Sequence, residues 1–113
     1  MSDTARVEGS AYHTPDLNWQ ELRGFPGTAK VKVLRYDVRS GAKTMLVQLP
    51  SGGQIFPHTH NTVVQHYVLE GEYETAGHVF KAGSYRLMPK DSPVPAMVAE
   101  RGVMFLLMSD PGV

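Results

Sequence analysis

Short hydrophobic runs separated by glycine and proline dominate the pattern of this chain. The runs are rich in valine, leucine, tyrosine and phenylalanine, and several alternate apolar with polar positions, as half-buried strands do. No segment carries a sustained helical period. We interpret as strands the runs 31–38, 44–49, 54–60, 63–70, 73–75, 78–81, 84–88, 96–100 and 103–108. The pattern therefore predicts an all-β fold, either a sandwich or a small barrel.

Turn residues separate these runs. Ser51-Gly52-Gly53 and Ala76-Gly77 are typical of hairpin turns. A bend at Glu70-Gly71 would reset the alternation of the surrounding strand, because one extra residue turns every later side chain to the other face. The run 103–108 is apolar at every position, which indicates burial inside the barrel on one face and under an arm or a partner subunit on the other.

Length and composition indicate a single domain. The chain has 113 residues, of which 42% are hydrophobic, enough for one globular core but not for two. We expect residues 1–11 to form a flexible tail and residues 12–113 to form the domain. Segment 12–25 contains the only tryptophan, Trp19, and we expect it to lie on the barrel as an N-terminal arm.

Charge and cysteine content exclude several classes of function. The 11 basic and 11 acidic residues balance, and no basic stripe is present, so we expect no nucleic-acid partner. The absence of cysteine excludes disulfides, thiolate metal ligands and a cysteine nucleophile. The N-terminus shows no signal-peptide core and no apolar run is long enough to cross a bilayer. We therefore expect a cytoplasmic protein without a membrane partner.

The segment His58-Thr59-His60 carries the strongest candidate chemistry. Two histidines two residues apart in an extended segment project to the same face. Neutral imidazole is the commonest metal ligand of proteins. The spacing favours a metal half-site on a strand over the alternative of two exposed histidines near a turn.

The surrounding residues resemble the first motif of the cupin superfamily (RmlC-like), Gly-x5-His-x-His-x3-Glu-x6-Gly. Counted from Gly52, the chain fits both histidines, and counted from Val64 it fits the closing Gly71. The segment from Gly83 to Pro89 resembles the start of the second motif, Gly-x5-Pro-x4-His. The resemblance implies an all-β, single-domain cupin, a jelly-roll-like double-stranded β-barrel with a metal in its mouth. It also leads us to expect a homodimer.

Within the cupins, segments 67–72 and 82–85 are similar to two groups. One comprises the acetylacetone and dihydroxyacetophenone dioxygenases, and the other the cupin-like domain of certain anti-sigma factors. The resemblance implies a divalent metal cofactor, with Fe(II) favoured and Zn, Ni, Mn or Cu as alternatives. We expect methionines to line the interior as core filler, although a thioether-rich mouth would favour copper. These are Met45, Met88, Met97, Met104 and Met108.

Two expected ligands are replaced in this chain. The glutamate position of the first motif holds Val64, and the histidine position of the second motif holds Val94. Catalytic zinc sites usually have three protein ligands, and many non-haem iron oxygenases use a triad of ligands. The chain must therefore supply a replacement, or the site is degenerate.

His66 is our favoured third metal ligand, together with His58 and His60. It shares strand parity with position 64, so the family register directs it into the barrel. Gln65 would face inward under the other register, and His78, beside a hairpin turn, is a further alternative. Tyrosine hydroxyls are candidate pocket groups, and Arg86 forms either an outward salt bridge or an anion clamp in the cavity.

Two classes of function follow. The first is an Fe(II)-type dioxygenase, an oxidoreductase acting on a small diketone or related carbonyl compound that binds the metal through its oxygen atoms. The alternative is a non-catalytic cupin that binds a small molecule or metal, as a sensor does. A metal-free cupin with histidine as a base, similar to the sugar isomerases, is a third option. The sequence assigns no catalytic residue.

Overall fold

The computed structural model describes residues 9–21 and 29–112. Their regular elements are strands, apart from one 3-10 turn, η2 (Thr14–Asp16). The long strands are β2 (Lys30–Tyr36), β3 (Lys43–Leu49), β6 (Val64–Thr75) and β11 (Val103–Ser109). The shorter strands are β1 (Gln20–Glu21), β4 (Gly53–Ile55), β5 (His58–Thr59), β7 (His78–Lys81), β8 (Tyr85–Met88), β9 (Pro93–Val94) and β10 (Met97–Ala99). The predicted all-β fold is confirmed.

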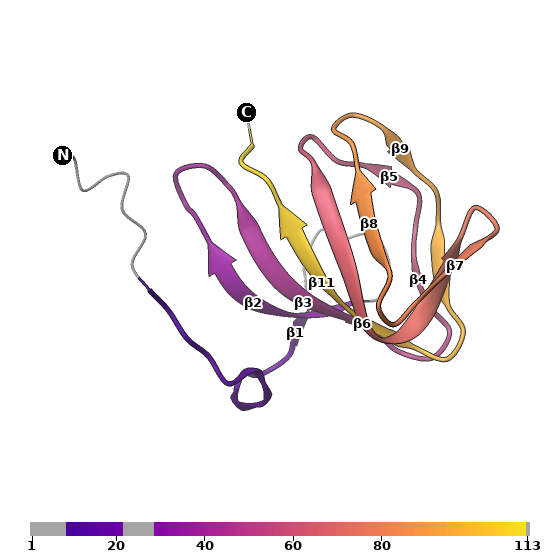
Figure 1. Ribbon diagram of the computed structural model, residues 1–113, viewed down its shortest axis with the longest axis horizontal. Coiled ribbons are helices and arrows are strands. Elements are labelled where there is room, and N and C mark those ends of the chain that lie inside the picture. The colour runs from indigo at the N-terminus through magenta and orange to yellow at the C-terminus, as the bar shows by residue number, and fades with distance from the viewer. Residues whose placement is uncertain (1–8, 22–28, 113) are drawn as a thin grey trace.

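The strands form one nine-stranded sheet that curls on itself, and one small two-stranded sheet (Figure 1). The large sheet has the order β1-β2-β3-β11-β6-β10-β4, with β7 and β8 also paired to β6, and β5 pairs with β9. All pairings are antiparallel. The first half of β6 pairs with β11 and β8, and its second half pairs with β7 and β10. The long strand β6 therefore joins the two sides of the barrel.

A β-bulge in the middle of β6 makes this change of side possible. Phe105 pairs with Val68 and Met104 pairs with Glu70, so Leu69 is an extra residue on β6. Before the bulge the even positions 64, 66 and 68 are buried, and after it the odd positions 73 and 75 are buried. Gly71 adopts φ +71, in the left-handed region. The predicted reset of parity near Glu70-Gly71 is confirmed.

Most predicted strands are confirmed, with four differences. The run 54–60 is divided at Phe56-Pro57 into β4 and β5, while the runs 63–70 and 73–75 are one continuous strand. The two-residue strands β1 and β9 were not predicted, because so short a segment carries no alternation. The turn at Ala76-Gly77 is confirmed, since both residues have positive φ, as a type I′ hairpin requires.

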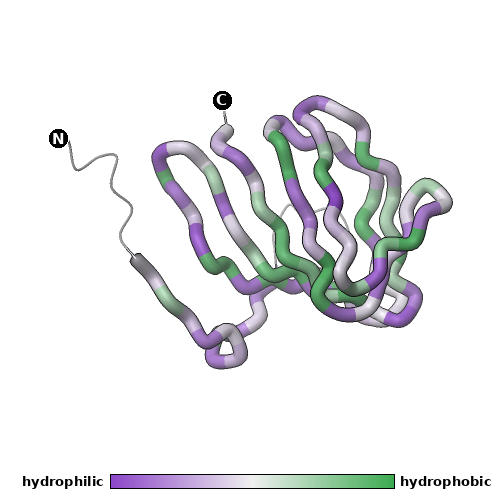
Figure 2. The backbone as a smooth tube through the Cα atoms, viewed as in Figure 1, coloured by the Kyte–Doolittle hydropathy of each residue, from purple (hydrophilic) through white to green (hydrophobic). Residues whose placement is uncertain are grey.

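The core fills the inside of the curled sheet. Its largest fully buried side chains include Tyr73, Phe105 and Met45, and hydrophobic positions gather where β3, β11 and β6 run side by side (Figure 2). Along β11 the inward residues are buried, whereas the outward residues, Met104, Leu106 and Met108, are only half-buried. The predicted burial of the inner face is confirmed, whereas burial of the outer face under a partner subunit stays a prediction.

The described part of the N-terminal arm lies at the β2 edge of the sheet (Figure 1). β1 pairs with the start of β2, Lys32 donates a hydrogen bond to the Thr14 carbonyl oxygen (2.8 Å), and its ammonium lies 4.6 Å from the centre of the Trp19 ring. Residues 1–8 of the expected tail and 22–25 of the expected arm lie outside the described residues. No helix in the described part has the length and hydrophobicity needed to cross a membrane.

Candidate metal and ligand site

The His58–His60 pair lies at the rim of the barrel, on the short sheet formed by β5 and β9. His58 stands opposite Val94 in the register, and His60 follows directly after β5. The Nε2 atoms of the two rings are 3.0 Å apart, and the rings meet edge to face with centroids separated by 4.5 Å. The predicted projection of both imidazoles to one side of the strand is confirmed.

A backbone hydrogen bond fixes the tautomer of His58. Its Nδ1 lies 2.8 Å from the carbonyl oxygen of Phe56. Because a carbonyl only accepts, Nδ1 carries the proton, and in the neutral ring the lone pair is on Nε2, facing His60. Metal-binding histidines usually make this type of bond through their other ring nitrogen, since it orients the ring and raises its basicity.

The surroundings of His60 keep it neutral. Burial, followed by the neighbouring charges of His58, Lys43 and Arg86, lowers the pKa of His60 from 6.5 to about 4. At neutral pH its ring therefore carries no charge. In the hydrogen-bonded pair its Nε2 donates to Nε2 of His58, so metal binding at this atom requires the proton to move to Nδ1. Two neutral imidazoles with converging nitrogen atoms are the donor set that a divalent transition metal prefers.

The geometry of the pair fits two positions around one metal ion. With metal–nitrogen bonds of about 2.0–2.1 Å, neighbouring ligand nitrogens lie about 2.8–3.4 Å apart, from octahedral to tetrahedral geometry. The Nε2 separation of 3.0 Å agrees with this range. However, the described residues contain no group of three histidine, cysteine or acidic side chains arranged around one ion. The motif positions that would add ligands hold buried hydrocarbon, Val64 (2% exposed) and Val94 (3% exposed).

His66 lies deeper in the barrel than this pair. It is 2% exposed, which confirms the inward register expected from its parity with position 64. Its Nδ1 shares a hydrogen bond of 3.0 Å with the Tyr73 hydroxyl, and its ring lies 4.3 Å from that of Phe105. Burial, assisted by the charge of Arg86, lowers the pKa of His66 to about 3. Metal ligation by His66 stays a prediction.

The other candidate residues lie away from this interior. Gln65 points to the outer face, where its Oε1 accepts a hydrogen bond from the Tyr85 hydroxyl, and His78 is exposed at the β6–β7 hairpin. Of the five methionines expected to line the interior, Met45, Met88 and Met97 are buried. The expectation is wrong for Met104 and Met108, which lie on the outward positions of β11.

Comparison with known families decides the classification. A family model described as the ChrR cupin-like domain matches residues 7–111, which is nearly the whole chain. The chain belongs to this cupin family. The recognition made from the two motifs is thereby confirmed.

Solved structures support the same cupin fold. An acetylacetone dioxygenase from Acinetobacter johnsonii superimposes with a TM-score of 0.75 at 15% identity, covering 97% of this chain and 77% of that one. An RmlC-like cupin from Shewanella frigidimarina gives 0.74 at 18% identity, covering 94% and 93%. The structure of Rhodobacter sphaeroides SigE in complex with the anti-sigma ChrR gives 0.69 at 24% identity, covering 84% of this chain and half (50%) of that one. No curated protein matches the chain.

Aromatic and cationic groups complete the interior of this cupin around His66. Tyr73 follows the bulge of β6, Phe80 stacks on it, and Arg86 of β8 stands opposite His66. Burial raises the pKa of Tyr73, and a hydrogen bond and the charge of Arg86 oppose that rise. The sequence pointed to tyrosine hydroxyls and to Arg86 as candidates, but not to the His66–Tyr73 bond. Seven residues and a bulge separate those two, and no local pattern brings them together.

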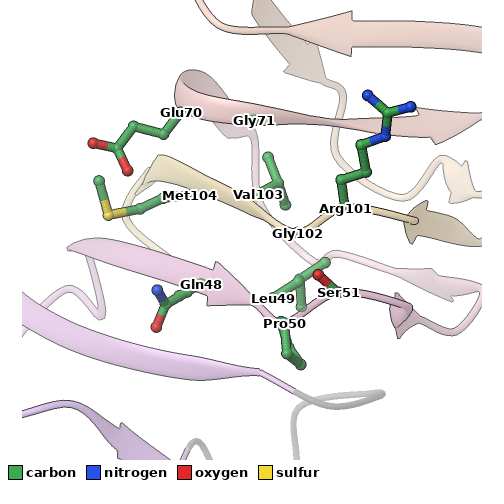
Figure 3. Close-up of a pocket in the computed structure, with 10 residues that line it drawn as sticks. All are labelled: Gln48, Leu49, Pro50, Ser51, Glu70, Gly71, Arg101, Gly102, Val103 and Met104. Atoms are coloured by element: carbon green, nitrogen blue, oxygen red, sulfur yellow. The ribbon is translucent and has the colours of Figure 1, made fainter.

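A separate hollow of about 330 Å³ lies at the turns between β3 and β4 and between β10 and β11 (Figure 3). Glu70, Met104 and Gln48 lie on one side of it, while Arg101 points away on the other side of Gly102 (Figure 3). None of its lining residues is a histidine. We therefore place the candidate site at the histidines and not in this hollow.

Proposed function

We propose that this cupin binds a divalent metal ion through His58 and His60 and uses it to bind a small organic molecule. The observation that carries the proposal is the pair of Nε2 atoms 3.0 Å apart, with His58 held by the Phe56 carbonyl. The activity that we favour is dioxygenation of a small diketone or related carbonyl compound, with Fe(II) as the metal. His66 remains our candidate for a third ligand.

The chain's own groups would bind and shield the reactants. The metal, when bound, would supply a Lewis acid and a template for oxygen atoms of the ligand. His58 and His60 would hold it as neutral donors, and the backbone bond of His58 would keep that ring oriented. Val64 and Val94 present hydrocarbon beside the pair and would limit the access of water.

The metal content of the purified protein tests the site. We expect near-stoichiometric metal in the parent and its loss in the double variant His58→Ala/His60→Ala. The variant His78→Ala is the matched control, because it removes an exposed imidazole at a hairpin. A parent that takes up no metal after reloading with Fe(II), Zn or Cu would contradict the proposal.

A non-catalytic cupin is the second candidate, and the two buried valines favour it. They occupy the positions where further ligands are expected, and two imidazoles alone hold a divalent ion weakly. Oxygen consumption by the Fe(II)-loaded protein in the presence of acetylacetone separates the two candidates. Consumption that disappears in the double variant supports the dioxygenase. Stoichiometric metal without consumption supports a binding module or sensor.

We also propose a homodimer. The outward residues of β11 and the neighbouring Tyr67 of β6 and Tyr85 of β8 form an exposed or half-buried apolar row on the outer face of the sheet. A solution mass near the 12.5 kDa of one chain would contradict this part of the proposal.

A further inference from the structure

Arg86 places a guanidinium group inside the barrel. It stands opposite His66 across the β6–β8 pair and two residues before the buried Met88, so it points to the inner face. Its Cζ lies 5.2 Å from the centre of the Phe80 ring and 6.0 Å from that of Tyr73. Its Nη1 lies 3.5 Å from the sulfur of Met97. The half-buried group is therefore held among aromatic and apolar side chains, with the Tyr73 hydroxyl as its hydrogen-bond partner.

No carboxylate of the described residues pairs with this cation. The two ion pairs in that part of the chain join His13 to Asp16 and Arg35 to Asp37. The nearby acidic residues of β6 are exposed and belong to the outer surface: Glu70, Glu72 and Glu74. The charged groups that act on His60 and His66 are all cations or other histidines.

An arginine in this position differs from the histidines around it. Burial lets the histidines shed their protons and become neutral, whereas a guanidinium stays charged at any pH that a protein survives. A partly dehydrated cation whose partner is a neutral hydroxyl rather than a carboxylate keeps an uncompensated charge, and a bound anion would offset that cost. The planar fork of donors also matches both oxygens of a carboxylate.

We propose that Arg86 binds the carboxylate of a small oxo acid at the mouth of the barrel. The proposal rests on the small-molecule site proposed above and specifies its ligand: an anion with a second carbonyl oxygen, rather than a neutral diketone. The aromatic rings of Phe80 and Tyr73 hold the guanidinium in place, and His60 and His66 lie within the range of its charge.

Two probes of nearly equal size test the requirement for charge. Acetoacetate carries a carboxylate where acetylacetone carries a second acetyl group, and both are titrated calorimetrically into the full-length protein after treatment with a chelator. We expect acetoacetate to bind at least tenfold more tightly than acetylacetone. The variant Arg86→Gln should lose this preference. The control Arg101→Gln removes the same charge from an exposed turn and should keep it.

The variant Arg86→Lys guards against a loss of folding, since it retains the positive charge and should retain part of the preference. Repeating the titrations on metal-loaded protein separates the two proposals. A preference for acetoacetate that depends on Arg86, in a protein that takes up no metal, would support this inference and contradict the proposed metal site. Equal binding of the two probes, binding of neither probe, or an unchanged preference in Arg86→Gln would overturn the inference, whatever the metal content.

Discussion

The His58–His60 pair and the His66–Tyr73 pair lie in the same barrel but use imidazole differently. Burial lowers the pKa of His60 to about 4 and that of His66 to about 3, so both rings are neutral at pH 7. At the rim, Nε2 of His60 faces Nε2 of His58 at a distance of 3.0 Å. In the core, Nδ1 of His66 is hydrogen-bonded to the Tyr73 hydroxyl. Burial makes both rings neutral, and they differ in their bonded neighbour, which is a second imidazole for His60 and a phenol hydroxyl for His66.

The two pairs also depend on different parts of the fold. The rim pair comes from residues two apart, one on β5 and one directly after it, so local geometry alone brings it together. The core pair joins residues on either side of the β6 bulge, so it forms only if the bulge is in place. Changes to the bulge should therefore damage the core pair first.

The largest expected effect comes from Gly71→Ala. A Cβ at this position would lie 2.3 Å from the carbonyl oxygen of Gly102, and the residue has φ +71. The left-handed conformation costs about 1–2 kcal/mol, and the overpacking costs about 1–3 kcal/mol more. We expect the free energy of unfolding, measured in urea, to fall by about 2–5 kcal/mol.

Gly77→Ala is the matched control for this substitution. Gly77 has φ +80 but no atom within 4 Å of a new Cβ, so only the conformational cost of about 1–2 kcal/mol remains. An equal loss of stability in the two variants would show that the close approach of the Gly71 backbone to the Gly102 carbonyl does not exclude a Cβ at the bulge.

The bulge also shows how much of the fold the sequence predicts. Alternation and turn residues predict most strands, and the conflict between the two alternating sets of β6 predicts a reset near Gly71. The division at Phe56-Pro57 and the strands β1 and β9 were not predictable, because pairing with distant strands creates them. Likewise, the outward positions of β11 are apolar in sequence, but only the structure shows that one chain leaves them half-exposed.

A smaller effect is expected from His66→Leu. The substitution places an apolar side chain of similar size against Phe105 but removes one of the two hydrogen-bond partners of the buried Tyr73 hydroxyl, the other being Arg86. An unsatisfied buried group costs about 1–3 kcal/mol, so the free energy of unfolding should fall by at most that amount. Metal content should also fall, because His66 is our candidate third ligand, but less completely than in the double variant at the rim.

Tyr73→Phe provides the second half of a double-mutant cycle. Removing both partners leaves no unsatisfied group, so the double variant should be more stable than the sum of the single losses predicts. A metal content of His66→Leu equal to that of the parent would instead show that the core histidine is not a third ligand.

The sequence predicted which residues form the candidate site better than it predicted the contacts between their side chains. The motif identified His58 and His60, and parity with position 64 placed His66 inside. The register then put Val94 directly opposite His58, as the spacing of the second motif requires. The bond of His66 to Tyr73 and the lack of an acidic partner for Arg86 among the described residues depend on which side chains meet across the barrel. No spacing in the sequence reports this.

The smallest expected effect is a dependence of stability on pH that arises mainly in the core pair. The folded pKa of His66 lies below its unfolded value of 6.5, so the unfolded chain binds the extra proton first as the pH falls. The stabilisation is complete above pH 6.5 and decreases towards pH 3, by about 1 kcal/mol per pH unit. The groups that face this ring supply no negative charge at these pH values that would favour its protonation; they are Tyr73, Arg86, His58 and His60.

Urea unfolding of the metal-free protein between pH 7 and pH 5, above the range of most carboxylates, measures the slope of stability against pH. His66→Leu should flatten the curve and leave only the weaker contribution of the partly exposed His60, whereas a slope equal to that of the parent would place the titrating group at the rim.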